Sequence, residues 1–246
     1  RAAVKRAMAL TGVADILDIG GESTRPGAAE VPAQEEIDRV LPVIEAIRSV
    51  GIATPISVDT RKAAVARAAL AAGADMVNDV SALTFDPDLA HVVAEAGAAL
   101  CLMHAKGTPE TMQADPHYDD VVAEVFDHLA ARIAAAEAAG IDRARLLVDP
   151  GIGFGKTLQH NVSLIRSLSV YHGLGAGVLL GASRKRFIGT IGEAPAASDR
   201  LGGSLAVALH AAGQGAQVIR VHDAYETRQA LRLHEALSGT GDDDGA

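Results

Sequence analysis

The sequence has almost no cysteine, few aromatic residues and no long apolar run. Cys101 is the only cysteine among 246 residues, so no internal disulfide can form, and a reducing cytoplasm is the expected location. No apolar run approaches the roughly 20 residues that span a bilayer, which argues against a membrane protein. A net charge of −9 argues against general nucleic-acid binding. The remaining expectation is a globular protein that binds small molecules.

Short apolar runs do occur, and they alternate with alanine-rich segments of helical spacing. Strands are expected at residues 15–21, 55–59, 76–79, 99–104, 146–149, 178–183 and 218–222. Helices are expected at residues 1–11, 33–50, 63–72, 87–96, 119–139, 159–171, 198–213 and 224–238. This alternation predicts parallel strands with right-handed crossovers. We expect residues 1–237 to form one domain and residues 238–246 to be a disordered tail.

Polar or charged residues end every expected strand, which favours an α/β fold of the TIM (β/α)8 barrel type. Such barrels build their sites from the carboxyl ends of all their strands, whereas a doubly wound open sheet, the alternative, uses one crevice. Seven strands are visible, and the chain opens with a helix. We therefore expect the first strand of the barrel and its loop to be missing from this sequence.

Three polar residues at strand ends are candidates for binding a flat heterocycle. Asp59, Asn78 and Asp149 offer two carboxylates and an amide, which complement a ring edge that carries adjacent donors and acceptors. Each could equally cap a helix or be a buried, hydrogen-bonded group, and Asp79 is a candidate for the capping role. Met103 could belong to the core or form an apolar surface for a ring.

Cations also follow the expected strands, although the protein is acidic overall. They are Arg25, Arg61-Lys62, Arg184-Lys185-Arg186, and Arg220 with His222. Their grouping on one rim suggests a small anionic ligand, while the alternative is ordinary solvated strand ends. Arg220 and His222 alternate with Val221, so a strand would point both into the barrel mouth. Phosphate sites of such barrels often involve the last two strands.

Two glycine-rich loops stand out. In Gly20-Gly-Glu-Ser-Thr-Arg-Pro-Gly27, glycines permit close approach to a ligand, and Thr24 and Arg25 offer a hydroxyl and a planar fork. The alternative is an ordinary Pro-Gly turn. The loop from Asp149 to Thr157 is not a nucleotide cradle, because proline occupies the position of its first required glycine. We interpret it as a flexible loop that presents Asp149 and Phe154. Cys101 is expected to be a packing residue, and no metal-ligand spacing is visible.

Taken together, these segments resemble the dihydropteroate synthase family of folate biosynthesis. The matching strings lie in the family's order between about residues 15 and 235. They are Gly20-Gly-Glu-Ser-Thr-Arg-Pro-Gly27, Ser57-Val-Asp-Thr60, Asn78-Asp79, Cys101-Leu-Met-His104, Gly107 with Thr111-Met-Gln113, Asp149-Pro-Gly-Ile-Gly-Phe-Gly-Lys156, Ser183-Arg-Lys185 and Arg220-Val-His-Asp223.

The resemblance implies a TIM-barrel transferase that condenses 6-hydroxymethyl-7,8-dihydropterin diphosphate with para-aminobenzoate, giving 7,8-dihydropteroate and diphosphate. It also implies Mg²⁺ as cofactor, sulfonamide drugs as substrate mimics and, commonly, a homodimer. The family's metal-binding asparagine would lie upstream of residue 1, so the metal ligand stays unknown here.

By the same resemblance, Asp59, Asn78 and Asp149 would hold the pterin edge, with Met103 and Phe154 as apolar walls. These five residues are therefore expected to bind one substrate.

The resemblance gives the catalytic roles to Lys185, Arg220 and His222, which also bind substrate. Lys185 would lie between the pterin and the aminobenzoate. Arg220 would stack on the pterin and, with His222, hold the diphosphate. Thr24 and Arg25 would border the aminobenzoate pocket and the leaving group.

Two other hypotheses stay open. One is a pterin-binding module without synthase activity, like the methyltetrahydrofolate-binding domains of corrinoid methyltransferases. Such a module would have less reason to keep the cations together, because it binds no diphosphate. The other is an inactive paralogue with a structural or regulatory role.

Overall fold

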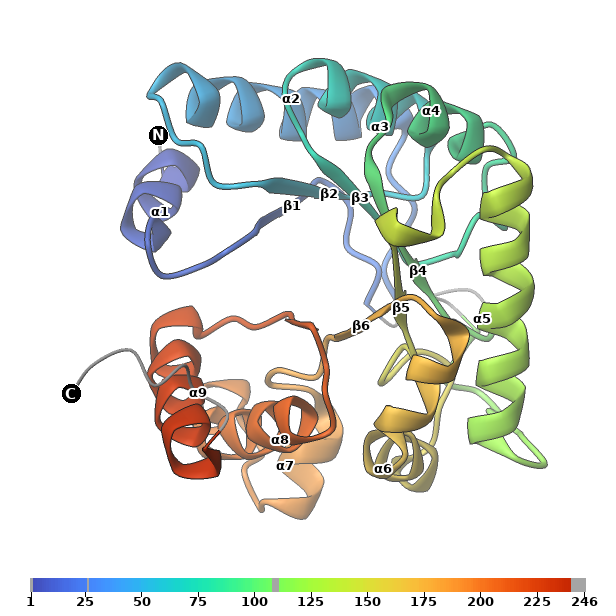
Figure 1. Ribbon diagram of the computed structural model, residues 1–246, viewed down its shortest axis with the longest axis vertical. Coiled ribbons are helices and arrows are strands. Elements are labelled where there is room, and N and C mark those ends of the chain that lie inside the picture. The colour runs from blue at the N-terminus through green and yellow to red at the C-terminus, as the bar shows by residue number, and fades with distance from the viewer. Residues whose placement is uncertain (1, 26, 108–110, 240–246) are drawn as a thin grey trace.

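The computed structural model describes residues 2–25, 27–107 and 111–239, and within these ranges it contains one curled parallel sheet (Figure 1). Its seven strands pair in the order β1-β2-β3-β4-β5-β6-β7, so each strand pairs with its neighbours in sequence. They are β1 (Leu17–Gly20), β2 (Ile56–Asp59), β3 (Met76–Asp79), β4 (Ala99–Met103), β5 (Leu146–Asp149), β6 (Gly177–Leu180) and β7 (Val218–Ile219). The prediction of a β/α-barrel sheet with seven strands is confirmed.

Helices cover the outer face of this sheet (Figure 1). They are α1 (Ala2–Leu10), α2 (Ala33–Ser49), α3 (Ala63–Ala71), α4 (Leu89–Ala96), α5 (Val121–Ala138), α6 (Leu158–Arg166), α7 (Arg186–Ile191), α8 (Leu201–Gly213) and α9 (Ala224–Ser238). Side chains fix two of the starts. Asp120 accepts hydrogen bonds from two backbone amides of α5, and Thr157 and His160 form a capping box on α6.

The structure departs from the expected elements in several places. The expected helix 159–171 is two elements, because α6 ends at Arg166 and a 3₁₀ helix (Leu168–Leu174) follows. The short helix α7 was not expected, since its six residues show too little periodicity. The last strand ends at Ile219, so Arg220 and His222 follow it, and the expected alternation within a strand is wrong. Residues 1 and 240–246, including most of the expected tail, lie outside the described residues.

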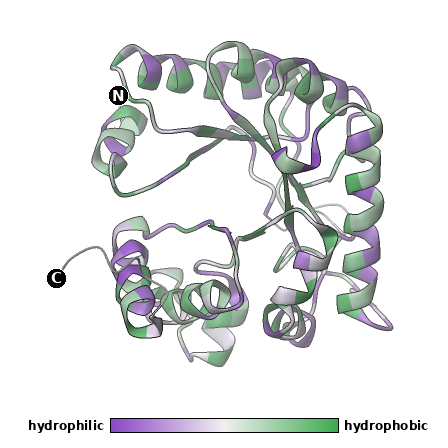
Figure 2. Ribbon diagram, viewed as in Figure 1, coloured by the Kyte–Doolittle hydropathy of each residue, from purple (hydrophilic) through white to green (hydrophobic). Residues whose placement is uncertain are grey.

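Alternation along each strand separates two apolar clusters. Val58, Val77, Leu100 and Val148 are fully buried on the outer face of the sheet and pack in one large cluster with the helices. The smaller cluster contains Met76, Cys101 and Leu179 on the inner face. Figure 2 shows the apolar residues gathered on the strands and polar residues on the outer helices. Cys101 is a buried packing residue, as expected.

A groove of about 980 Å³ opens between the first and last strands of the sheet. Its lining includes residues of α1 and β1 on one side and of β7 and α9 on the other. Contacts that cross it include those of Arg220 with Asp18, of Arg228 with Asp15 and the carbonyl oxygen of Val13, and of Arg6 with the carbonyl oxygen of His222. The groove continues inward to Asn78 and Lys185, so it joins the barrel interior to the surface.

None of the helices within the described ranges combines the length and the apolar character needed to cross a membrane.

Candidate functional site

Three polar residues face the barrel interior at the carboxyl end of the sheet. Asp59 ends β2 and is in register with Asn78 on β3, and Asp149 ends β5 in register with Met103 on β4. Asn78, Met103 and Asp149 are buried, and the Asp59 side chain is only 13% exposed. The parallel register therefore brings two carboxyl groups and an amide from separate strands to one mouth.

The expected capping role of Asp79 is wrong, because α4 begins after Asp88. The alternative of a buried, hydrogen-bonded group holds for Asp79 and in part for Asp149. Asp79 accepts hydrogen bonds from the backbone amides of Ser81 and Leu83, at 2.7 and 2.6 Å, and so fixes the turn after β3. Asp149 accepts one bond, 2.7 Å long, from the Gly151 amide through Oδ1. Burial raises the pKa of Asp149, although the positive charge of Lys185 opposes that shift. Asp149 therefore stays available to a ligand through its other oxygen.

Lys185 lies beside these acids. Its Nζ donates to the carbonyl oxygen of Ile152 and lies 4.7 Å from the centre of the Phe154 ring. Burial lowers the pKa of Lys185 to about 8, and the charge of Asp149 is the main opposing influence. Lys185 is thus a cation close to its titration range, held between an aromatic ring and a carboxylate.

Arg220 joins the acids to the first strand. Its guanidinium lies 2.6 Å from Oδ2 of Asp18 and 3.0 Å from Oδ2 of Asp59. The Arg220 side chain is still 46% exposed, so it borders the interior and also faces the groove. Burial, followed by the charge of Asp18, raises the pKa of Asp59 to about 7. The two acids and the arginine therefore form one electrostatic unit.

His222 lies in a region of positive charge. Its Nδ1 is 3.1 Å from Oγ of Ser183, which anchors the ring to the loop after β6. Burial lowers the pKa of His222, and the nearby guanidinium groups of Arg184, Arg220 and Arg25 lower it further. A neutral imidazole among three guanidinium groups suits an anionic ligand.

Thr24 and Arg25 lie on the loop between β1 and α2. Arg25 is exposed and close enough to His222 to affect its pKa, so this loop reaches the same mouth. Among the described residues, no hydrogen bond or ion pair is made by either side chain. The loop backbone therefore sets where these two groups stand.

The comparisons with known proteins bear on this arrangement. Residues 1–222 match the family described as pterin binding enzyme. The chain belongs to the pterin binding enzyme family. It is 49% identical over 220 residues to dihydropteroate synthase of Escherichia coli K12, which covers 89% of this chain and 77% of that protein.

Solved structures of the family agree in fold. Dihydropteroate synthase of Yersinia pestis, in a sulfonamide drug complex, has a TM-score of 0.91 at 44% identity, over 97% of this chain and 85% of that one. The Xanthomonas albilineans enzyme with 4-aminobenzoic acid has a TM-score of 0.90 at 49% identity, over 96% and 84%. The TIM-barrel fold and the family resemblance expected from the motifs are both confirmed.

Sequence reasoning missed one residue of the site in this family member. Asp18 was part of an expected strand and received no role, yet it makes the shortest contact to Arg220. A signal was present, since an aspartate interrupts the apolar run between Leu17 and Ile19. Its partner Arg220 is 202 residues away in the chain, and the two residues come together only because the sheet curls.

The loop after β5 is more tightly packed than expected. Lys156 is 2% exposed, and its Nζ lies 2.9 Å from Nδ1 of His104 and 3.0 Å from the carbonyl oxygen of Phe154. Burial lowers the pKa of Lys156 to about 7. Lys156 thus fastens this loop to the one after β4, and its ammonium group is used in contacts within the protein.

The described residues include no group of three or more His, Cys, Asp or Glu side chains that could hold a metal ion. They do not by themselves make a Mg²⁺ site, so the chemistry of the site is derived from the protein groups alone.

Proposed function

We propose that this protein is a dihydropteroate synthase, a transferase that joins 6-hydroxymethyl-7,8-dihydropterin diphosphate to para-aminobenzoate and releases diphosphate. The observation that carries the proposal is the meeting of buried acids and cations at one barrel mouth, in a chain 49% identical to a dihydropteroate synthase. We assign the activity to one domain spanning residues 1–237.

In this proposal the pterin occupies the barrel interior. Asp59, Asn78 and Asp149 hydrogen-bond to its ring edge, and Met103 and Phe154 supply apolar surface for its faces. Carboxylates are suited to this task because a pterin edge presents adjacent N–H donors. Burial of the acids strengthens each of these bonds, since water cannot compete for them.

The cations are assigned to the diphosphate and the second substrate. Arg220 stacks on the pterin and, with His222, receives the diphosphate. Lys185 lies between the two substrates, and Thr24 and Arg25 border the aminobenzoate. The support is electrostatic: three guanidinium groups act on His222, with Asp223 as the opposing charge, whereas Asp18 and other acids act on Asp59.

The reaction then needs no nucleophile from the protein. The bond between the exocyclic pterin carbon and the diphosphate oxygen breaks, and the oxygen keeps the electron pair. The aryl amine nitrogen forms the new bond to that carbon and loses one proton. Lys185, Arg220 and His222 stabilise the developing negative charge on the leaving group, which is the main way such a site lowers the barrier.

Three further properties belong to this proposal. Mg²⁺ is the expected cofactor, because the leaving group is a diphosphate and the family resemblance implies it. A homodimer and a cytoplasmic location are expected as well, the latter because the only cysteine is free.

Substitution of Lys185 tests the proposed chemistry. We expect Lys185→Ala to lower the rate of diphosphate release by about 10²–10³-fold, as loss of one transition-state donor does. Cys101→Ala, which changes a packing residue of the inner cluster, should leave the rate largely unchanged. Diphosphate release is measured with both substrates, with and without Mg²⁺.

Near-normal kinetics of Lys185→Ala would place the reaction elsewhere. Calorimetry separates the alternatives: a chain that binds the pterin diphosphate but releases no diphosphate on addition of aminobenzoate is a pterin-binding module or an inactive paralogue.

A further inference from the structure

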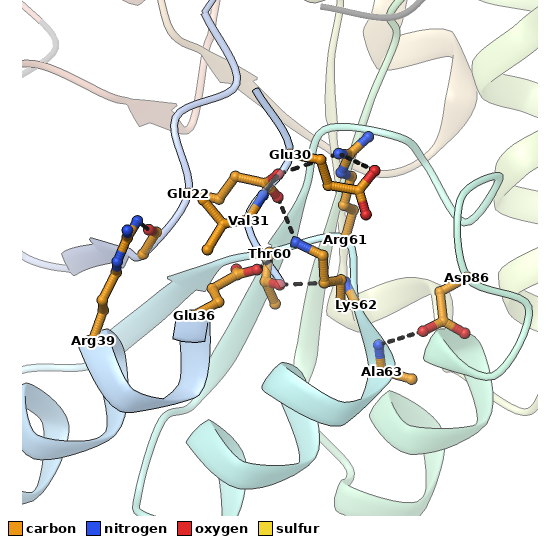
Figure 3. A network of polar contacts seen from close by, with 11 residues as sticks. Glu22, Glu30, Val31, Glu36, Arg39, Thr60, Arg61, Lys62, Ala63 and Asp86 are labelled. Atoms are coloured by element: carbon orange, nitrogen blue, oxygen red, sulfur yellow. Dashed lines mark hydrogen bonds and ion pairs between the residues drawn. The ribbon is translucent and has the colours of Figure 1, made fainter. Parts of the chain in front are cut away.

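A buried charge cluster lies beside the mouth, outside the groups assigned above. Lys62, just after β2, places Nζ 2.7 Å from Oε2 of Glu22 and 2.7 Å from Oε2 of Glu36 (Figure 3). Glu22 belongs to the loop after β1, and Glu36 lies in the first turn of α2. We call these three residues the clamp. One lysine thus ties a loop and a helix to the strand end that carries Asp59.

The clamp is buried and its charges are compensated. The side chains of Glu22, Glu36 and Lys62 are 3%, 0% and 7% exposed. Burial alone would raise the pKa of Glu22, but hydrogen bonds from Lys62, Val31 and Arg61 outweigh it, and the pKa is lowered. Burial alone would lower the pKa of Lys62, but the two glutamates outweigh it, and the pKa is raised. Both shifts favour the charged forms of Glu22 and Lys62, and losing one partner would leave buried charge unpaired.

The clamp closes the loop between β1 and α2. Oε1 of Glu22 accepts a hydrogen bond, 3.0 Å long, from the Val31 amide at the far end of the loop. At the near end, a Cβ on Gly21 would lie 2.9 Å from Cγ of Glu36, so the backbone already rests on α2. The loop is thus fastened at both ends, and Thr24 and Arg25 lie in the span between.

Further contacts stiffen the clamp from the side of β2. The guanidinium of Arg61 lies 3.3 Å from Glu22 and 3.9 Å from the centre of the Phe85 ring. Oδ2 of Asp86 accepts a hydrogen bond, 2.8 Å long, from the Ala63 amide next to Lys62 (Figure 3). The base of the Lys62 side chain is therefore fixed before it reaches the loop.

We propose that the clamp is a positioning device: it holds the loop that carries Thr24 and Arg25, and so sets the affinity for the second substrate, an aromatic amine with a carboxylate. Among the described residues, the clamp forms no hydrogen bond or ion pair with the acids of the interior or with Lys185, although the charge of Glu36 acts on Asp59. Its main effect is therefore on the second substrate, with a smaller effect on pterin affinity. This inference rests on the proposed synthase function.

The test is a comparison of Lys62→Met with Arg67→Met, which removes an exposed cation of α3. We expect Lys62→Met to raise KM for aminobenzoate about tenfold, the loss that one charge-assisted hydrogen bond produces. The affinity for the pterin diphosphate, measured by calorimetry, should stay within about twofold of that of the unaltered chain. Such a change is smaller than the loss of one hydrogen bond would cause. Lys62→Arg should recover part of the loss in KM, because it keeps the positive charge although its larger guanidinium differs in shape from an ammonium group.

Glu22→Gln is the second variant, with Glu45→Gln on the exposed side of α2 as its control. This variant preserves an acceptor for the Val31 amide and weakens the ion pair with Lys62, so we expect a smaller rise in KM than for Lys62→Met. It therefore tests the inference even if Lys62→Met fails to fold. Unchanged KM in both clamp variants, or an equal loss of affinity for both substrates, would overturn the inference.

A binding measurement separates this inference from the proposed function. Aminobenzoate is titrated into each variant with 6-hydroxymethyl-dihydropterin and inorganic diphosphate present, a mixture that cannot react forward. If the unaltered chain shows no turnover, the synthase proposal fails, yet weaker aminobenzoate binding in Lys62→Met would still support the clamp. Equal binding in all variants contradicts the clamp whatever the turnover.

Discussion

Asp59 has conflicting neighbours at the scale of single residues. Burial and the charge of Asp18 favour its neutral form, while Arg220, 3.0 Å away, favours the carboxylate. The outcome is a pKa raised from 3.8 to about 7. A group with a raised folded-state pKa stabilises the fold fully below its unfolded pKa, and this contribution is lost as pH rises through about 7.

This titration predicts the pH dependence of pterin binding. The ring N–H groups need the carboxylate form, so the affinity should rise as pH increases through about 7 and then level off. Asp59→Asn should bind the pterin about fivefold to thirtyfold more weakly, which corresponds to the loss of about 1–2 kcal/mol from a buried hydrogen bond. Calorimetry at pH 6, 7 and 8 measures both effects. A pH dependence that persists in Asp59→Asn would assign the titration to another group.

Asp18 shows what a single residue can and cannot reveal from sequence. Its position inside an apolar run marks it as unusual, but nothing local indicates Arg220 as its partner. Lys156 shows the reverse case, because its glycine-rich surroundings suggest a flexible loop, whereas the fold buries it against His104.

At the scale of elements, the loop after β5 depends on close backbone approach. Gly151 has φ of +70°, and a Cβ there would lie 1.8 Å from the carbonyl oxygen of His104. Glycine is therefore required on two grounds, conformation and space. The loop carries Asp149 at its start and Phe154 near its end, so its packing fixes two groups of the site.

Gly151→Ala should destabilise the fold far more than Gly140→Ala. Gly140 also has a positive φ, +94°, but nothing lies within 4 Å of a Cβ there. Gly140→Ala isolates the conformational cost of about 1–2 kcal/mol. Gly151→Ala adds a clash with backbone and should exceed that cost. Urea denaturation of both variants measures the difference in the free energy of unfolding. Equal losses would mean that the loops after β4 and β5 can move apart without cost.

At the scale of the whole molecule, the sheet has a continuous centre and two outer strands. β3, β4 and β5 pair on both sides, whereas β1 and β7 face the groove within the described part of the chain. Contacts across the groove are few and partly exposed, and such ion pairs contribute about 0–1 kcal/mol each.

Hydrogen exchange should therefore be uneven. We expect the slowest amide exchange in β3, β4 and β5, and faster exchange in β1 and β7, because outer strands open without disrupting the centre. Mass spectrometry of the native chain in deuterated buffer measures this order. Protection of β7 equal to that of β4 would mean that the outer strands unfold only with the whole sheet.

The sequence by itself determined the alternation of strands and helices, the barrel class and the residue types that end each strand. These follow from periodicity and from motifs of adjacent residues, which are local properties. The family resemblance was also local, because it rested on short strings in a fixed order.

Only the tertiary structure decided which of those residues meet. The pairing of Arg220 with Asp18 and Asp59, the burial of Lys156 and the joining of Glu22, Lys62 and Glu36 all cross between separate elements. The curling of the sheet sets these distances, and burial shifts the pKa values of the groups that it brings together. Neither quantity is encoded in any one segment, because each depends on atoms that segments far apart in the chain bring together.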